Sequence, residues 1–138
     1  MPAAQSLGES SEAVLVFPSI TQAGLIIGGQ YGDGVMFKNG VPVDYYQVTG
    51  GSFGLQAGAQ TTSQAYFFTT PEALQTFENT AGWRVGAGLN VAVASVGTTG
   101  QINTSTLQQP VVVFVYGQSG LMAGVQVEGQ EITKLAQN

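Results

Sequence analysis

The sequence contains no histidine and no cysteine, and it carries little charge of either sign. Three basic and eight acidic side chains make up 8% of its 138 residues, about a third of the share in an average soluble domain. Without histidine or cysteine the chain lacks the usual zinc ligands, a thiol nucleophile and an imidazole base. These absences exclude most familiar catalytic sites, and we expect a protein that is not an enzyme and binds no metal or cofactor.

The basic side chains are Lys38, Arg84 and Lys134, and the net charge is −5. Because nucleic-acid binding depends on clustered lysine and arginine, we expect no nucleic-acid partner. The same balance is unfavourable for capture by anionic lipid headgroups, so any membrane contact would have to be mainly apolar. No apolar run approaches the roughly 18 residues that span a bilayer, and the run over 111–116 suits a buried strand.

Twenty glycines are the most distinctive feature of the chain, and many recur four residues apart. Because four is an even number, glycines at this spacing lie on one face of a strand. Over 53–60 the odd positions carry Phe, Leu, Ala and Ala, and the even positions carry Gly, Gln, Gly and Gln. Similar alternation over 85–94 and 121–128 predicts strands with one apolar and one nearly bare face. Either packed protein or a ligand must lie close to the bare face.

Turn and capping residues divide the chain into about seven strands and one clear helix. Asn39-Gly40 predicts a tight hairpin. Thr70 followed by Pro71 predicts the start of a short helix that buries Leu74 and Phe77 and ends before Gly82. Strands are expected over 24–37, 41–45, 45–60 with a bend at Gly50-Gly51, 65–69, 85–96, 111–116 and 121–127. Residues 10–12 suit the cap of a short helical turn, but the apolar residues 13–17, which precede Pro18, suit a short strand or a buried turn equally well.

These elements predict a mainly β fold of the β-rich α+β kind. Short connections favour antiparallel pairing, and glycine-rich strands bend tightly. We therefore expect a strongly curved antiparallel sheet, or a small partly closed barrel, of about seven strands with one or two short helices. Residues 1–12 are expected to form a flexible tail, and residues 13–138 a single domain.

Three ordered blocks of the sequence resemble the signatures of the SYLF domain, a lipid-binding module of bacteria, fungi, plants and animals. The opening block lies over 17–35 and ends in GGQYGDGV, the central block is GGSFGLQAGAQ over 50–60, and the closing block is YGQSGLMAGV over 116–125. The resemblance assigns a structural role to the signature residues Gly28, Gly29, Gly32, Gly34, Gly50, Gly51, Ser52, Gly54, Gln56, Gly58, Gln60, Ser119, Gly120 and Gly124.

The resemblance implies phosphoinositide or general lipid binding, association with actin in fungal members, and export in bacterial members, often as envelope lipoproteins. The basic amphipathic segment that begins the family's domain does not precede Ala13, and 41–46 replaces its tryptophan-containing loop. We expect a bilayer surface, and not actin, as the partner. The expected location is the periplasm or the outer membrane of a bacterium, with signal and anchor outside this chain.

Five residues are candidates for lipid contact. Trp83-Arg84 suits a membrane interface or a headgroup clamp, although Trp83 could instead close one end of the barrel with Arg84 extending outward. Tyr45 and Tyr46 point to opposite faces of a strand, so one is expected in the core and the other at a contact surface. Lys38, in the hairpin, completes the set.

The function we expect is non-enzymatic lipid binding in a bacterial envelope protein, and the alternative is a structural or protein-interaction domain without lipid affinity. Two carboxylate pairs, Glu128 with Glu131 and Asp33 with Asp44, are close enough in sequence or expected fold to act as acid and base. Both pairs occupy turns or edges, where solvated carboxylates are normal.

Overall fold

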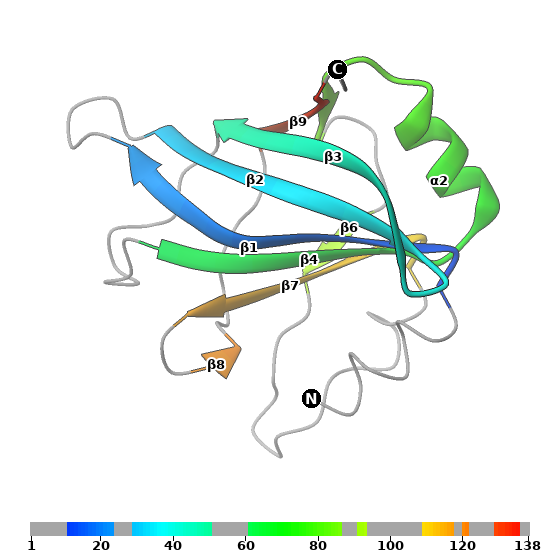
Figure 1. The fold of residues 1–138 in the computed structure, drawn as a ribbon, viewed down its shortest axis with the longest axis horizontal. Coiled ribbons are helices and arrows are strands. Elements are labelled where there is room, and N and C mark those ends of the chain that lie inside the picture. Colours follow the sequence, from blue (N-terminus) through cyan, green and yellow to red (C-terminus); the bar gives the residue numbers. More distant parts are fainter. Residues whose placement is uncertain are drawn as a thin grey trace.

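The computed structural model describes residues 11–23, 29–50, 61–86, 91–93, 109–117, 120–121 and 129–135. Within these residues the chain forms one nine-stranded sheet and one short helix (Figure 1). The elements are β1 (Ala13–Ala23), β2 (Gly29–Lys38), β3 (Val41–Gly50), β4 (Thr61–Phe68), α2 (Pro71–Glu78), β5 (Trp83–Arg84), β6 (Val91–Val93), β7 (Val111–Gly117), β8 (Gly120–Leu121) and β9 (Gln130–Lys134).

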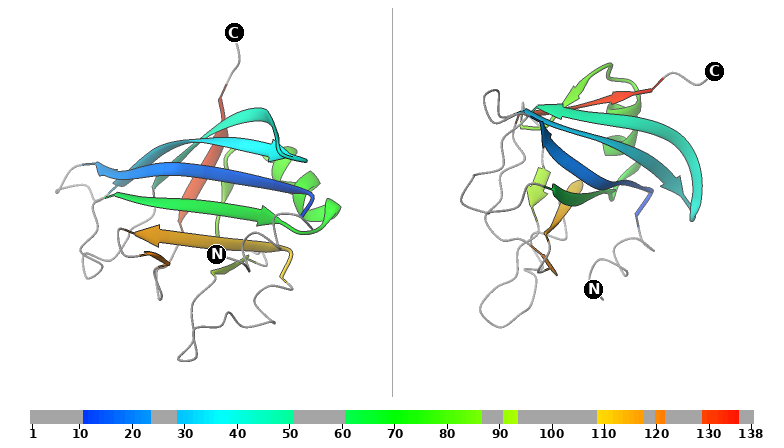
Figure 2. Two further views of the ribbon diagram at one scale, coloured as in Figure 1. Left: turned by 60° about the horizontal axis from the view of Figure 1, so that its bottom comes forward. Right: turned by 60° about the vertical axis from the view of Figure 1, so that its left-hand side comes forward.

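The sheet has the strand order β5-β9-β3-β2-β1-β4-β7-β6, and β8 pairs with β7. Figure 2 shows how strongly it curls, so that β9 and β3 lie across from β4 and β7. The predicted mainly β class and the strong curvature are confirmed, and the described strands outnumber the expected seven. Residues 1–10 of the predicted tail lie outside the described residues, while the Glu12 amide donates to the Phe68 carbonyl at 2.8 Å.

The later strands depart from the expected pattern in two places. All pairings between described strands are antiparallel except that of β6 with β7, which is parallel. The chain between these strands, residues 94–110, is long enough for the crossover that a parallel pair requires. The predicted strand over 85–96 is also wrong at its start, because Val85 and Gly86 form a turn that hydrogen-bonds to Gln130 and Gly129.

Strand β1 resolves the alternative that the sequence left open at residues 13–17. It runs through Pro18, and its pairing with both neighbouring strands shifts register around that residue. Such a bulge accommodates proline, which has no amide hydrogen to donate to a ladder. The Pro18 carbonyl accepts a hydrogen bond from Ser63 Oγ at 2.6 Å. The bulge therefore bends β1 without leaving this carbonyl unpaired.

The bare face of β2 is covered by side chains of the protein itself. A Cβ placed on Gly34 would lie 2.5 Å from the Phe17 ring and 2.8 Å from the Val16 carbonyl oxygen, and one on Gly32 would lie 2.9 Å from Ile20. No real Cβ tolerates such distances, so glycine is required for β1 and β2 to approach this closely. The packing interpretation is confirmed for these two signature glycines.

The hairpin and the helix follow the sequence signals. Asn39 and Gly40 join β2 to β3 with φ values of 53° and 78°, the backbone that two-residue hairpin loops require. Thr70 caps α2, since its Oγ1 accepts a hydrogen bond from the Ala73 amide at 3.1 Å. Leu74 and Phe77 are buried as predicted.

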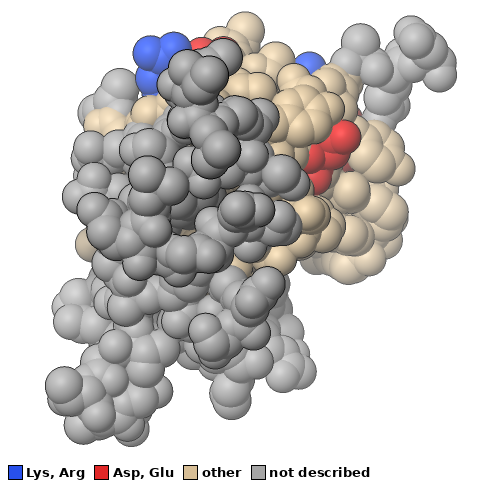
Figure 3. Space-filling view, turned by 90° about the vertical axis from the view of Figure 1, so that its left-hand side faces the viewer, with Lys and Arg blue, Asp and Glu red and all other residues tan. Residues whose placement is uncertain are grey.

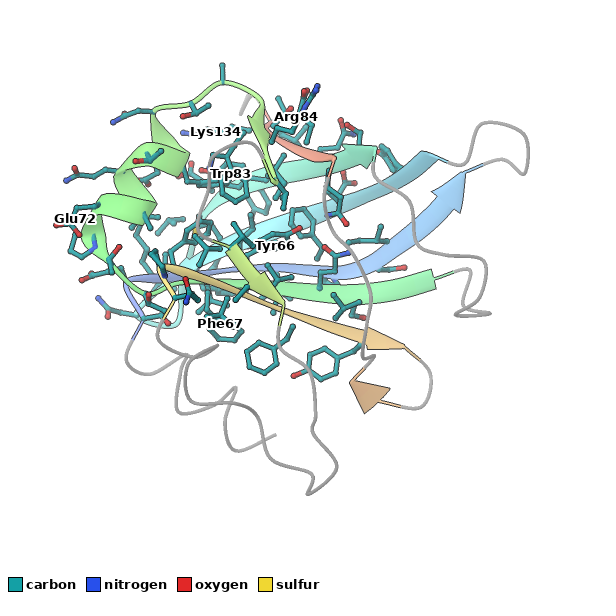
Figure 4. All side chains as sticks on the ribbon, turned by 180° about the vertical axis from the view of Figure 1, so that it is seen from behind. Tyr66, Phe67, Glu72, Trp83, Arg84 and Lys134 are labelled. Atoms are coloured by element: carbon teal, nitrogen blue, oxygen red, sulfur yellow. The ribbon has the colours of Figure 1, made fainter. Side chains whose placement is uncertain are left out.

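Apolar side chains pack on both faces of the sheet. The main core lies inside the curl and includes Phe17, Met36, Val48 and Ile132. A second cluster of Phe67, Val112 and Phe114 lies on the opposite face. In Figure 4, Tyr66 and Phe67 accordingly point to opposite sides of β4. Strand β7, buried on both faces from Val111 to Val115, explains the continuous apolar run in the sequence.

Candidate functional site

Trp83 lies in the core and not on the surface. Its side chain is 2% exposed, and its ring centroid lies 5.1 Å from that of Phe77, 6.0 Å from Phe68 and 6.2 Å from Tyr66. Figure 4 shows Trp83 directed into the curl and Arg84 directed away from it. The sequence left two interpretations of Trp83-Arg84, a membrane contact or a tryptophan that closes one end of the barrel with Arg84 extending outward. The structure fits the second. We name this aromatic group, Tyr66, Phe68, Phe77 and Trp83, the tryptophan corner.

The adjacent tyrosines Tyr45 and Tyr46 have opposite environments. Tyr45 is 48% exposed, whereas Tyr46 is 4% exposed and its ring lies 5.0 Å from that of Phe77. Burial, and then the carboxylates of Asp44 and Glu78, raise the pKa of Tyr46 to about 12. Only Tyr45 of the two is available for a contact at the surface.

All three basic side chains of the chain are paired with carboxylates. Lys38 Nζ lies 2.9 Å from Glu78 Oε2, Arg84 Nη2 3.0 Å from Glu131 Oε2, and Lys134 Nζ 3.3 Å from Asp44 Oδ1. The pair of Lys38 joins the end of the β2–β3 hairpin to the last residue of α2. Each basic side chain that a phosphate group could approach therefore already has a carboxylate beside it. The face in Figure 3 shows few basic or acidic atoms on its described part.

The large exposed apolar side chains of the described residues lie on one hairpin. Among the described residues, the large hydrophobic side chains that are exposed all belong to the β2–β3 hairpin, namely Tyr31, Val41, Val43 and Tyr45. Only Tyr45 was singled out from the sequence. A signal for the other two β3 residues was present in the alternation of Val41, Val43 and Tyr45, but alternation does not tell which face of a strand is covered.

A buried polar cluster was missed by the sequence analysis. Gln64 and Gln130 exchange two hydrogen bonds of 2.9 and 3.0 Å between their side-chain amides. Gln130 Nε2 also donates to the Tyr66 hydroxyl at 2.7 Å, and that hydroxyl donates to Gln64 Oε1 at 3.0 Å. All three side chains are at most 1% exposed. Because β3, β2 and β1 separate β9 from β4 in the sheet, the cluster ties the two sides of the curl together.

The structure describes five of the signature residues. Gly32 and Gly34 are buried in β2, Gly29 begins β2, Gly50 ends β3 and Gly120 begins β8. The remaining signature residues lie outside the described residues, namely Gly28, Gly51, Ser52, Gly54, Gln56, Gly58, Gln60, Ser119 and Gly124.

The carboxylates that were considered as acid and base do not come together in the described part of the chain. Asp33 pairs in register with Gln47. Asp44 pairs with Met36, which lies three positions beyond Asp33 on β2. Glu131 is engaged with Arg84, and Glu128 lies outside the described residues. Within the same residues, no group of three or more metal-binding side chains is found.

No helix that the structure describes is long and apolar enough to cross a bilayer. The sequence model of the Ysc84 family, described as a Las17-binding protein and actin regulator, matches residues 49–137, more than half of the chain. The match includes the central and closing blocks. No curated protein matches the sequence. Members of this family are binding domains associated with lipid and actin. The chain belongs to the Ysc84 family of SYLF domains.

Proposed function

We propose that this domain binds lipid without catalysing a reaction, as part of a bacterial cell-envelope protein. The observation that carries the proposal is the concentration of exposed apolar side chains on one hairpin of a chain whose cations are all paired. Membership of the SYLF family supports lipid as the ligand.

The proposed contact depends little on charge. A headgroup phosphate that approaches Lys38, Arg84 or Lys134 meets a carboxylate no more than 3.3 Å from the same cation. The net charge of −5 adds a weak long-range repulsion from anionic lipid. Apolar and interfacial interactions, rather than selection of a phosphoinositide headgroup, therefore supply the affinity in this proposal. On the same grounds we propose no contact with actin.

Flotation with vesicles tests this function. We expect the chain to float with phosphatidylcholine vesicles, and adding phosphatidylserine or raising the salt should change the bound fraction by less than about twofold. Failure to float with any vesicle would contradict the proposal. Binding that requires phosphatidylserine and disappears at high salt would instead indicate recognition of anionic headgroups.

A periplasmic or outer-membrane location is part of the same proposal. Low charge and abundant Gly, Gln, Thr and Ser are common in exported bacterial proteins, and the SYLF resemblance implies the same location. Fractionation of the source cells, followed by detection of this chain, should place it in the envelope fraction. Recovery with the cytosolic fraction would contradict this part of the proposal.

The alternative is a structural or protein-interaction domain without lipid affinity. Its support is the acidic balance of the chain and the fact that an exposed apolar hairpin also suits a protein partner. Crosslinking from the hairpin in source-cell extract, combined with an absence of vesicle binding, would favour it. Vesicle binding by the purified chain alone would count against it.

A further inference from the structure

The end of the β2–β3 hairpin is the most apolar exposed part of the described surface. We call residues 35–45 the hairpin tip. Val41, Val43 and Tyr45 are 57%, 39% and 48% exposed, and Val35 and Phe37 are partly exposed beside them. Val35 pairs in register with Tyr45, and Phe37 pairs with Pro42. Cross-strand partners share a face, so Val35 lies beside Tyr45, while a register shift between Met36 and Phe37 sets Val41 opposite Lys38. The exposed apolar side chains therefore gather at this end of the hairpin around the bulge, although the register does not put all of them on one face.

The hairpin tip is electrically balanced, although it contains two charged residues. These are Lys38 and Asp44, and each forms an ion pair with a residue outside the tip, Glu78 in α2 and Lys134 in β9 respectively. Neither pair leaves a net charge at the tip. A charged partner, anionic or cationic, would find no unpaired group of opposite charge at the tip. An uncharged apolar partner would find exposed apolar side chains.

A single aspartate separates the tip from the rest of the hairpin face. Asp33, which is exposed, lies between Val35 and Tyr31 on β2, and its register partner is Gln47. Tyr31 is 47% exposed, nearly the same fraction as Tyr45. The two tyrosines share the outward face of the hairpin, but only Tyr45 lies within the hairpin tip.

The exposed apolar area of the hairpin tip alone is smaller than one side of a standard protein interface. The exposed parts of Val41, Val43 and Tyr45 amount to on the order of 250 Å², against ~800 Å² that each partner of a standard interface contributes. A small apolar surface with a tyrosine hydroxyl at its margin instead suits the boundary between the polar and apolar layers of a bilayer, where tyrosine is enriched.

We propose that the hairpin tip is the membrane-contacting element of this domain, and that it enters the interfacial layer of a lipid surface of no net charge. The proposal rests on the lipid-binding function proposed above and adds the surface and the class of lipid. Val41, Val43 and Tyr45 enter the interface, and Asp33 marks the depth at which entry stops.

The test compares two tyrosines of equal exposure on one hairpin. Partitioning onto phosphatidylcholine vesicles is measured for the native chain, Tyr45→Ser and Tyr31→Ser. Because the Tyr45 ring loses its apolar contact, we expect partitioning to weaken about tenfold in Tyr45→Ser. Tyr31→Ser should differ from the native chain by less than about twofold. Both replacements are on exposed strand positions, and far-ultraviolet circular dichroism checks that each variant folds.

The other outcomes separate this proposal from the function on which it rests. Native binding with equal effects of the two replacements would overturn the tip as the contact and leave lipid binding intact. Absence of native binding would overturn the lipid-binding function itself. If the double variant Val41→Ser/Val43→Ser kept native affinity, that result would also overturn the proposal.

Discussion

The tryptophan corner and the hairpin tip combine similar residue types but have opposite environments. Trp83-Arg84 and Lys38 with Tyr45 each place an aromatic ring near a cation in the sequence. Trp83 is 2% exposed because α2, β4 and β9 pack around it, whereas Tyr45 is 48% exposed. The comparison teaches that the exposure of such a ring is decided by elements distant in sequence, and that only the tip offers a surface for a ligand.

Replacing each ring by alanine should sharpen this comparison most strongly. Trp83→Ala leaves a cavity among three other aromatic rings, and we expect it to lower the free energy of unfolding by about 3–5 kcal/mol. Tyr45→Ala should change it by no more than about 0.5 kcal/mol, since surface substitutions have small effects. Urea unfolding followed by circular dichroism measures both. Equal losses in the two variants would remove the distinction between corner and tip.

The buried polar cluster behind the corner should give the next largest effect. In Gln130→Met, the Tyr66 hydroxyl and the Gln64 amide lose partners while remaining buried, so we expect a loss of about 1–3 kcal/mol. Gln75→Met, a change of the same kind on the exposed face of α2, is the matched control and should be nearly neutral. Similar stability of the two variants would show that the cluster does not hold the curl together.

The pH dependence of stability separates Tyr46 from the tip. The folded pKa of Tyr46 is about 12, above the ordinary 10.0, so its contribution to stability is complete below pH 10 and is lost as the pH rises toward 12. Burial raises the pKa of Tyr66 as well. We therefore expect Tyr46→Phe to reduce, but not abolish, the fall in stability over this pH range. Identical pH profiles for the native chain and Tyr46→Phe would argue against this burial of Tyr46.

A small effect on stability, and a clear effect on binding, is expected from the ion pairs that balance the tip. Asp44→Asn/Glu78→Gln frees Lys134 and Lys38, and the stability should change by only about 0–1 kcal/mol for each pair. The variant should bind phosphatidylserine-containing vesicles more tightly than the native chain at low salt, and lose this gain at high salt.

A control with the same change in net charge makes that result specific. Glu12→Gln/Glu72→Gln also raises the net charge by two, but neither carboxylate lies in one of the three ion pairs. We expect less than half of the gain in binding from this variant. Equal gains would show that net charge, and not the release of the two lysines, controls binding to anionic lipid.

Local signals in the sequence predict much of the fold. Asn39-Gly40, Thr70-Pro71 and the alternating apolar positions identify the hairpin, the helix and most strands, because each signal reflects the backbone of a few neighbouring residues. The passage of β1 through Pro18 and the parallel pairing of β6 depend on partners far away in sequence. Local patterns do not contain that information.

The candidate site was only partly predictable for the same reason. The opposite directions of Tyr45 and Tyr46 follow from the pleat of a strand, and the structure agrees. The burial of Trp83 and the pairing of Lys38 with Glu78, forty positions away, depend on how α2 packs against the sheet. Gln64 and Gln130 resemble surface residues in the sequence, since nothing near either one reveals the other as its partner.

The most direct test of the account is a depth measurement with a tryptophan at the tip. Trp83 is the single tryptophan of the chain and is buried, so it supplies a constant background in the native chain, in Tyr45→Trp and in Gln75→Trp on α2. Fluorescence is recorded with phosphatidylcholine vesicles whose acyl chains are brominated. We predict strong quenching in Tyr45→Trp and none beyond the native level in Gln75→Trp. Equal quenching in the two variants, or quenching in Gln75→Trp alone, would contradict membrane contact through the hairpin tip.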